Sequence, residues 1–172
     1  MTGVPRHPAL RDAAPAVFWL DDPRAPQPEP RLESRIECDL AIVGAGFTGL
    51  WSALLARRRN PALDIVVLEA RRSAAAASGR NGGFCDASLT HGFANGVSRF
   101  SAEIDTLDRL GLQNLDAIES TVREHDIDCD FERTGMLDMA TASWQYAELV
   151  EAAEAMRAHG YRVDTLDADA VR

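Results

Sequence analysis

The chain has 172 residues and a formal net charge of −9, which argues against nucleic acid or an anionic membrane surface as a general partner. All 18 basic residues are arginine, so Schiff-base chemistry and a Walker-type phosphate lysine are excluded within this sequence. There is no run of eighteen apolar residues, and Cys38, Cys85 and Cys129 are widely spaced without a CxxC pair. The sequence therefore predicts no transmembrane helix, no metal site and a reducing, cytoplasmic location.

Residues 1–35 are predicted to form an extended arm, because seven of the 8 prolines lie in this stretch. Proline at this density removes backbone donors and blocks both helix and central strand. The aromatic tripeptide Phe18–Leu20 lies inside the arm. We interpret it as an anchor that pins the arm to the surface of the following domain, with a partner-binding site as the alternative.

Residues 36–97 are predicted to form a nucleotide-binding unit. An apolar strand, Arg35–Val43, leads into a glycine turn, Gly44–Gly49, with the sequence GAGFTG. A helical pattern follows, and a second apolar strand, Ile65–Leu68, ends at Glu69. Strand, glycine turn, helix, strand and acid in this order are typical of a dinucleotide-binding βαβ unit.

Each glycine of that motif, and the acid that ends it, has a physical role. Gly44 allows the tight turn out of the strand, Gly46 lets a pyrophosphate approach backbone N–H groups, and Gly49 lets the helix pack closely on the strand. Glu69 lies about 20 residues past Gly49, where a carboxylate can accept hydrogen bonds from ribose hydroxyls and disfavours the 2′-phosphate of NADP. The alternative is a glycine turn in some other α/β domain, but the flanking elements favour the nucleotide motif.

A second glycine-rich stretch, Ser78–Gly83, is called the SGRNGG loop below. Its three glycines allow the backbone to bend into positive φ and to approach a ligand, while Ser78, Arg80 and Asn81 add donors. The preceding alanine run could form a short helix. An ordinary flexible loop is the alternative interpretation of the SGRNGG stretch.

These residues carry a resemblance to a known family. The chain resembles the N-terminal part of the D-amino-acid-oxidase-like FAD-dependent oxidoreductases, close to their γ-glutamylputrescine-oxidase-like branch. The resemblance rests on Phe18–Leu20, Cys38–Leu55, the strand ending at Glu69-Ala70, and Ala77–Phe84, roughly the first half of the chain. It implies that the glycine turn holds the ADP half of FAD and that the SGRNGG loop lies along the pyrophosphate and flavin. The implied cofactor contacts are Gly44, Gly46, Phe47, Thr48, Gly49, Glu69, Ala70, Ser78, Gly79, Arg80, Asn81, Gly82 and Gly83.

The chain departs from the family pattern just before the SGRNGG loop. The resemblance leads us to expect glycines there, whereas this chain has Ser73–Ala76. Backbone freedom is lower in such a segment.

Cys85 and His91 lie close in sequence to the SGRNGG loop, and the stretch Asp86–Gly96 is predicted to be a loop. A covalent flavin link at Cys85 and a catalytic role for His91 are alternatives to a small buried thiol and a solvated histidine. The second pair of interpretations is favoured, because free cysteines are usually buried and loop histidines usually solvated. No residue is identified as catalytic.

Residues 98–172 are predicted to begin an α+β substrate domain. Gly111 could bend or divide its first helix, and Asp167–Arg172 starts a further helix, which leads us to expect that the chain is cut short. The predicted elements are a long amphipathic helix over Phe100–His125, a strand–turn–strand over Asp128–Ala140, a helix over Gln145–His159 and a strand over Tyr161–Leu166.

The predicted function is the FAD-binding N-terminal portion of an oxidoreductase that oxidises amines or amino acids. In the family that the chain resembles, a hydride passes to FAD and O2 is the final acceptor. The expected partners are a small-molecule amine or amino-acid substrate and the missing C-terminal half of the same enzyme. The alternatives are a non-catalytic nucleotide-binding fragment and an NAD-dependent dehydrogenase domain.

Overall fold

The structure is a computed structural model that describes residues 11–13, 16–24 and 27–171. It consists of two compact units, Met1–Phe84 and Cys85–Arg172. The predicted domain boundaries, after residues 35 and 97, stay predictions. The elements in chain order are a 3₁₀ turn Phe18–Leu20, β1 (Leu40–Val43), α1 (Phe47–Arg59), β2 (Ile65–Leu68), a 3₁₀ turn Ala77–Gly79, α2 (Phe93–Phe100), α3 (Ile104–Glu124) and α4 (Ser143–Ala158).

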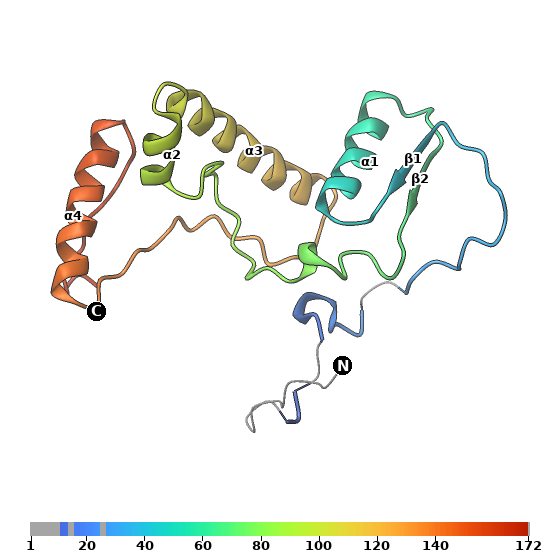
Figure 1. The fold of residues 1–172 in the computed structure, drawn as a ribbon, viewed down its shortest axis with the longest axis horizontal. Coiled ribbons are helices and arrows are strands. Elements are labelled where there is room, and N and C mark those ends of the chain that lie inside the picture. The colour runs from blue at the N-terminus through green and yellow to red at the C-terminus, as the bar shows by residue number, and fades with distance from the viewer. Residues whose placement is uncertain (1–10, 14–15, 25–26, 172) are drawn as a thin grey trace, which may run out of the picture. The chain divides into compact units, whose positions relative to one another are not determined.

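The first unit is built on the predicted βαβ arrangement. β1 and β2 pair in parallel, with Leu40 opposite Ile65 and Val43 opposite Leu68, and α1 connects them and packs on the sheet (Figure 1). Along β1 the side chains alternate between half-buried and exposed, and Val43 is 86% exposed. One face of β1 is therefore covered by α1, and the other is open among the described residues. The parallel βαβ unit agrees with the predicted α/β class.

The first strand is shorter than predicted, because the stretch from Arg35 to Asp39 is not part of the ladder. The reason lies at Asp39 and Asp64. The Asp64 carbonyl oxygen accepts from the N–H of Asp39 and of Leu40, and the Asp39 carboxylate accepts from the N–H of Asp64 at 2.9 Å. This turn-like pairing ends the ladder, because β2 offers no partner before Ile65.

The second unit consists of helices. The predicted long helix is confirmed as α3, and the apolar side chains of its predicted seam are half-buried or buried: Ile104, Leu107, Leu115, Ile118 and Val122. Gly111 does not divide the helix. A Cβ at Gly111 would overlap the carbonyl oxygen of Ala87, so this glycine permits close approach of the neighbouring chain.

Three predictions for the second unit are wrong. The stretch predicted as a loop up to Gly96 ends instead in α2, which begins after Gly92, a glycine with φ of +96°. Neither Asp128–Ala140 nor Tyr161–Leu166 forms a strand, and the described part of this unit contains no β ladder. Alternating apolar side chains do not by themselves supply the backbone hydrogen bonds between segments that a strand requires.

Arginine side chains hold both of these irregular segments to helices. Arg133 Nη1 donates to Asp116 Oδ1 at 2.6 Å and to Glu119 Oε2 at 2.8 Å, both on α3. Arg157, at the end of α4, donates to the carbonyl oxygen of Val163 at 2.9 Å and to the hydroxyl of Thr165 at 2.6 Å. The predicted second helix is confirmed as α4.

An aromatic cluster packs between helices of the second unit. The ring of Phe93 on α2 meets His159 edge-on at a centroid distance of 4.9 Å and Tyr161 at 5.3 Å. Burial raises the pKa of the Tyr161 phenol, and its hydrogen bond to Asp108 on α3 raises it further. The cluster therefore connects the start of α2, the first turns of α3 and the end of α4.

Apolar side chains are poorly covered in both units. In the described chain no large side chain is fully buried, and the buried apolar residues are Ala45, Ile104 and Ala153. Met136, Leu137 and Met139 are each about 70% exposed. None of the described helices is long and apolar enough to cross a membrane.

Candidate cofactor-binding site

The glycine turn Gly44–Gly49 joins the carboxyl end of β1 to the first turn of α1. Gly44 has φ of +99°, a conformation that favours glycine, and its N–H donates to the carbonyl oxygen of Leu68 at 2.7 Å. A Cβ at Gly49 would overlap the carbonyl oxygen of Gly44 and lie 3.3 Å from Cγ2 of Ile42. The geometry thus gives Gly44 its turn and Gly49 its close helix–strand contact, as the sequence predicted.

Backbone N–H groups at the start of α1 are available to a ligand. Leu50 is the first residue of α1 whose N–H makes a helical hydrogen bond, to the carbonyl oxygen of Gly46 at 3.0 Å. The N–H of Phe47 donates to Ser78 Oγ at 2.9 Å. No hydrogen bond of the described residues uses the N–H of Gly46, Thr48 or Gly49. Unpaired N–H groups at a helix N-terminus, where the helix dipole is positive, suit a diphosphate.

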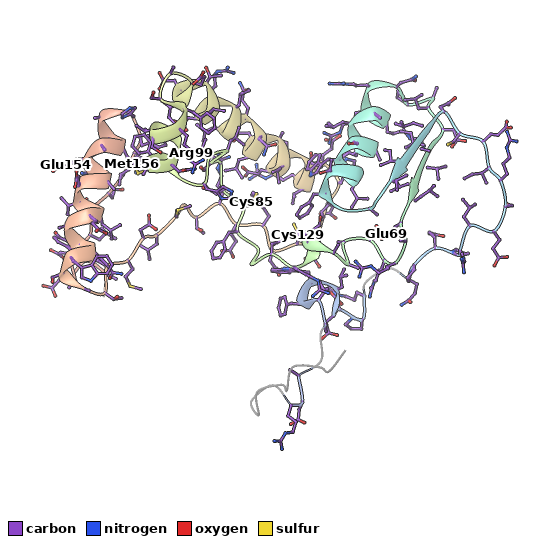
Figure 2. The ribbon with its side chains drawn as sticks, in the orientation of Figure 1. Glu69, Cys85, Arg99, Cys129, Glu154 and Met156 are labelled. Carbon is purple, nitrogen blue, oxygen red and sulfur yellow. The ribbon has the colours of Figure 1, made fainter. Side chains whose placement is uncertain are left out.

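Glu69 follows β2 directly (Figure 2). Its carboxylate reaches back to the glycine turn. Its Oε2 accepts from the N–H of Ala45 at 2.9 Å, and its Oε1 accepts from the N–H of Arg71 at 3.1 Å. These two hydrogen bonds, the one from Ala45 being the stronger influence, hold the pKa of Glu69 below its ordinary value. The carboxylate is therefore ionised at neutral pH, and its exposed lone pairs can still accept from hydroxyl groups.

The SGRNGG loop is closed by its own polar groups. Asn81 Nδ2 donates to the carbonyl oxygen of Ser78 at 2.6 Å, and Asn81 Oδ1 accepts from the N–H of Gly83 at 2.8 Å. Gly79 is buried, whereas Arg80 and Gly82 are exposed. The structure brings Ser78 to the start of α1, but it uses the Asn81 amide to fix the loop. Asn81 therefore has less freedom to contact a ligand through its side chain than the sequence suggested.

The segment before the loop contains a strained alanine. Ala74 has φ of 60°, a left-handed conformation that costs a residue with a Cβ about 1–2 kcal/mol. Its N–H donates to the carbonyl oxygen of Ala45 at 2.9 Å, so it lies against the glycine turn. The departure at Ser73–Ala76 therefore coincides with a backbone position where glycine would be relaxed. The alanine run forms turns rather than a helix before the 3₁₀ turn Ala77–Gly79.

The remaining candidates are Ala70, Cys85 and His91, and the backbone of Ala70 adds to the hydrogen bonding that lowers the pKa of Glu69. Ala70 is exposed beside Glu69. Cys85 is exposed, so the prediction of a buried thiol is wrong, and His91 is exposed with φ of 57°, in agreement with a solvated histidine. The sequence did not reveal that Trp19 contacts the SGRNGG loop; the aromatic tripeptide signalled an anchor but not its target.

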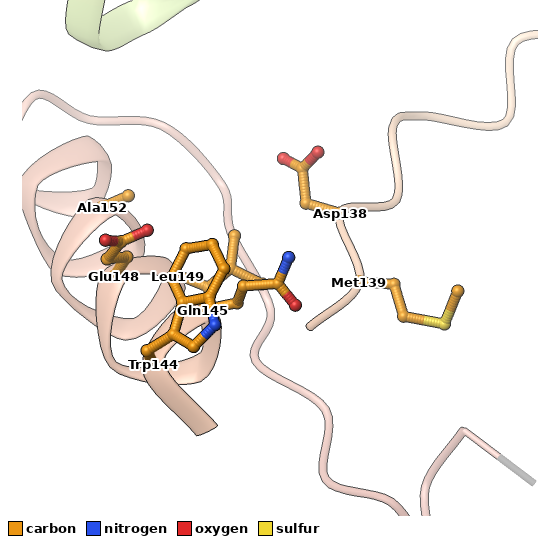
Figure 3. A pocket seen from close by; sticks show the side chains of 7 residues that line it. All are labelled: Asp138, Met139, Trp144, Gln145, Glu148, Leu149 and Ala152. Carbon is orange, nitrogen blue, oxygen red and sulfur yellow. The ribbon is translucent and has the colours of Figure 1, made fainter. Parts of the chain in front are cut away.

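The second unit contains an open pocket of about 400 Å³. Trp144, Gln145, Glu148, Leu149 and Ala152 of α4 lie on one side, and Asp138 and Met139 lie on the other (Figure 3). None of the cofactor contacts predicted from the sequence lines this pocket.

Comparison with known proteins decides between FAD and NAD. A family model described as FAD dependent oxidoreductase matches residues 39–172. The chain belongs to the FAD-dependent oxidoreductase family. The cofactor of this family is FAD, and the NAD-dependent alternative is set aside.

Two curated relatives are similar to this family member. The chain is 36% identical to the γ-glutamylputrescine oxidoreductase of Escherichia coli (strain K12) over 147 residues, which cover 82% of this chain and 33% of the relative. It is 28% identical to the probable oxidoreductase OrdL of Haemophilus influenzae (strain ATCC 51907 / DSM 11121 / KW20 / Rd) over 127 residues, covering 71% and 28%. The chain thus spans about a third of the length of these relatives. No solved structure matches it significantly.

The glycine turn of this FAD-dependent oxidoreductase has the chemistry that the ADP half of FAD requires. A Cβ at Gly44 would meet no described atom within 4 Å, so the space beside the turn is open. The unpaired N–H groups of Gly46, Thr48 and Gly49 can meet phosphate oxygens, and the ionised Glu69 can accept hydrogen bonds from ribose hydroxyls. The residues present therefore fit the group.

Proposed function

We infer that this chain forms the ADP-binding and flavin-facing part of an oxidoreductase that oxidises amines or amino acids, with O2 as the electron acceptor. The observation that carries the proposal is the set of unpaired N–H groups at the start of α1, beside the ionised Glu69. Backbone N–H groups at a helix N-terminus attract a diphosphate, while the carboxylate favours a ribose that carries no 2′-phosphate. The γ-glutamylputrescine oxidoreductase of E. coli is named for an amine substrate, which supports amines as the substrate class.

Each group of residues has a distinct role in this proposal. The glycine turn binds the diphosphate through the N–H groups of Gly46, Thr48 and Gly49, and Phe47 lies beside them with its own N–H donated to Ser78. Glu69 with Ala70 faces the adenosine ribose. The SGRNGG loop faces the flavin side, where Ser78 can donate its hydroxyl hydrogen while its oxygen accepts from Phe47. When bound, FAD supplies a hydride acceptor for the C–H bond next to the substrate nitrogen. None of these residues is assigned as a general base.

Catalysis is proposed to need more chain than these residues. Because the chain spans about a third of the relatives, the polypeptide corresponding to their remaining length is the proposed source of the substrate pocket and of a cover over the flavin. An uncovered flavin stands in water, without substrate orientation or a preorganised dry site. The widely spaced free thiols of Cys38, Cys85 and Cys129 support the cytoplasm as the proposed location.

A second candidate function is nucleotide binding without turnover, which is favoured because the chain spans only about a third of the relatives' length. The two candidates are separated by one pair of measurements. The first is FAD titration into the 172-residue chain, with Gly46→Val as the matched variant that blocks the diphosphate space. The second is hydrogen peroxide release with putrescine derivatives and small amino acids.

The expected result is FAD binding that Gly46→Val abolishes, with peroxide released by a chain extended to the length of the relatives but not by the 172 residues alone. Peroxide release by the 172 residues at the extended chain's rate would contradict the need for further polypeptide. Equal FAD binding by the wild-type chain and Gly46→Val would contradict the diphosphate role of the glycine turn.

A further inference from the structure

We propose that Trp19 is a positioning residue of the cofactor site, which holds the SGRNGG loop in the shape that receives the flavin. The cofactor part of this statement rests on the proposed function, whereas the ordering of the loop by Trp19 is independent of it. Trp19 lies in the N-terminal arm, far in sequence from the loop. Its role is therefore a product of the fold and goes beyond an anchor for the arm.

Trp19 contacts the loop in two ways. Its indole Nε1 donates to the carbonyl oxygen of Asn81 at 2.9 Å. Its six-membered ring occupies the place of a side chain at Gly83, where a Cβ would lie 2.8 Å from Cζ2 and 3.0 Å from Cη2. Gly83 also has φ of +84°, so both its backbone conformation and the neighbouring indole require glycine.

The turn that carries Trp19 is fixed by a backbone hydrogen bond and by a second contact with the loop. The N–H of Leu20 donates to Val17 at 3.0 Å and closes the 3₁₀ turn. Val17 Cγ1 lies 3.0 Å from the place of a Cβ at Gly79, so the arm contacts the loop at a second glycine. Phe18 packs edge-on against Trp19 but is 80% exposed, whereas Trp19 is 48% exposed. Phe18 is therefore a matched aromatic neighbour whose own contacts with the loop are minor.

The Trp19 hydrogen bond joins a continuous chain of contacts. Trp19 fixes the main chain of Asn81, and the Asn81 side chain closes the loop onto Ser78 and Gly83. Ser78 Oγ in turn accepts from the N–H of Phe47, at the start of α1. The network thus runs from the arm to the proposed diphosphate end of the site. Apart from Trp19, its members are predicted cofactor contacts themselves.

The glycines of the loop explain why such a tether has a use. Glycine loses more conformational freedom on ordering than any other residue, so a loop with three glycines is costly to fix at the moment of binding. A loop ordered before the ligand arrives avoids that cost and binds more tightly. Trp19 orders the loop without occupying the groups proposed to bind the cofactor. Its indole N–H is bonded to the backbone of Asn81, and the unpaired N–H groups of the glycine turn stay free.

The first test needs no cofactor, because Arg80 is an exposed trypsin site within the loop. Trp19→Ala should speed cleavage after Arg80 by roughly tenfold, the order expected for losing one hydrogen bond and its packing. Trp19→Phe, which keeps a ring but loses the N–H, should give a smaller increase, and Phe18→Leu should behave as the wild-type chain. Cleavage after Arg57–Arg59, at the end of α1, reports general unfolding of the same unit.

The second test is FAD titration with the same variants, following flavin absorbance and its spectral shift on binding. Trp19→Ala should weaken binding and change the bound spectrum, while Phe18→Leu should do neither. If the wild-type chain binds no FAD, the proposed function fails for these residues, and Arg80 cleavage alone decides the loop-ordering role.

The positioning role is overturned if Trp19→Ala and Trp19→Phe leave Arg80 cleavage at the rate of Phe18→Leu. It is also overturned if cleavage after Arg57–Arg59 rises in parallel, because Trp19 would then only stabilise the whole unit. Normal FAD affinity with an unchanged spectrum in a Trp19 variant whose loop is cleaved faster would overturn the cofactor part of the statement.

Discussion

Replacing Gly49 with alanine tests whether the close contact between α1 and β1 sets the shape of the glycine turn. A Cβ at this position would overlap the carbonyl oxygen of Gly44, and it would lie 3.1 Å from the Gly44 carbonyl carbon and 3.3 Å from Ile42 Cγ2. Two of these atoms belong to the backbone of the turn, which cannot rotate away as a side chain can. The helix must therefore move off the strand, or the turn must change its path.

The size of the effect follows from two opposing contributions. Forcing an extra carbon into a closely packed place costs about 1–3 kcal/mol, and more where backbone must shift. Alanine in place of glycine within a helix returns about 1 kcal/mol through its higher helix propensity. Because backbone must shift here, the cost lies at the upper end of that range, and a net loss of about 2 kcal/mol is expected. This loss lowers the thermal midpoint of a chain of this size by roughly 4–8 °C.

The assay is thermal unfolding followed by far-UV circular dichroism, with Gly82→Ala as the matched control. Gly82 lies in the same unit, and a Cβ there would make ordinary contacts of 3.4 Å and 3.5 Å with the Phe84 ring. The control should therefore keep the wild-type midpoint or raise it slightly. A Gly49→Ala midpoint equal to that of Gly82→Ala would refute the reasoning, since the glycine would not then set the helix–strand distance.

Three predictions concern the cofactor site and one concerns the second unit. Glu69→Gln should weaken FAD binding by about tenfold. It should also remove a stabilisation that is fully present above pH 4.5, the ordinary carboxyl pKa, and is lost as pH falls through the lowered pKa of Glu69 in the folded chain. Acid unfolding of the wild-type chain and the variant measures this loss. Gly46→Val should reduce FAD affinity more than stability, because Gly46 has an ordinary φ of −87° and its Cβ would press, at 2.9 Å, only on the Ser78 hydroxyl, a side-chain end that can rotate. Loss of stability with normal binding in the folded fraction would mark it as structural. Ala74→Gly should stabilise the chain by about 1 kcal/mol in urea unfolding by relaxing a positive φ, and an unchanged midpoint would count against the strain. Tyr161 has a raised pKa, so its stabilisation is complete below about pH 10 and is lost as pH rises through the higher folded value; ultraviolet titration of Tyr161→Phe should lack the later phenol step seen in the wild-type chain.

The sequence by itself determined the local elements whose cause lies within a few residues. β2 has its predicted bounds, and α1 begins at Phe47, within the glycine turn, and ends at Arg59, the last of the three arginines. The seam of α3 and the position of α4 also follow from short-range apolar spacing. A helix satisfies its backbone hydrogen bonds within its own segment, so its pattern can be recognised without knowing its partners.

Only the tertiary structure decided what depends on partners distant in the chain. The alternation at Asp128–Ala140 and Tyr161–Leu166 predicted strands, but a strand needs a neighbouring strand for its N–H and C=O groups. Asp128–Ala140 instead reaches α3 through its own Arg133, and Tyr161–Leu166 accepts from Arg157 of α4. The sequence showed the glycines but not why positions 111 and 83 require glycine. The reasons are the backbone of Ala87 and the ring of Trp19, which lie where a Cβ would be. Spacing along the chain carries no information on such contacts, which exist only once folding brings the separated residues together.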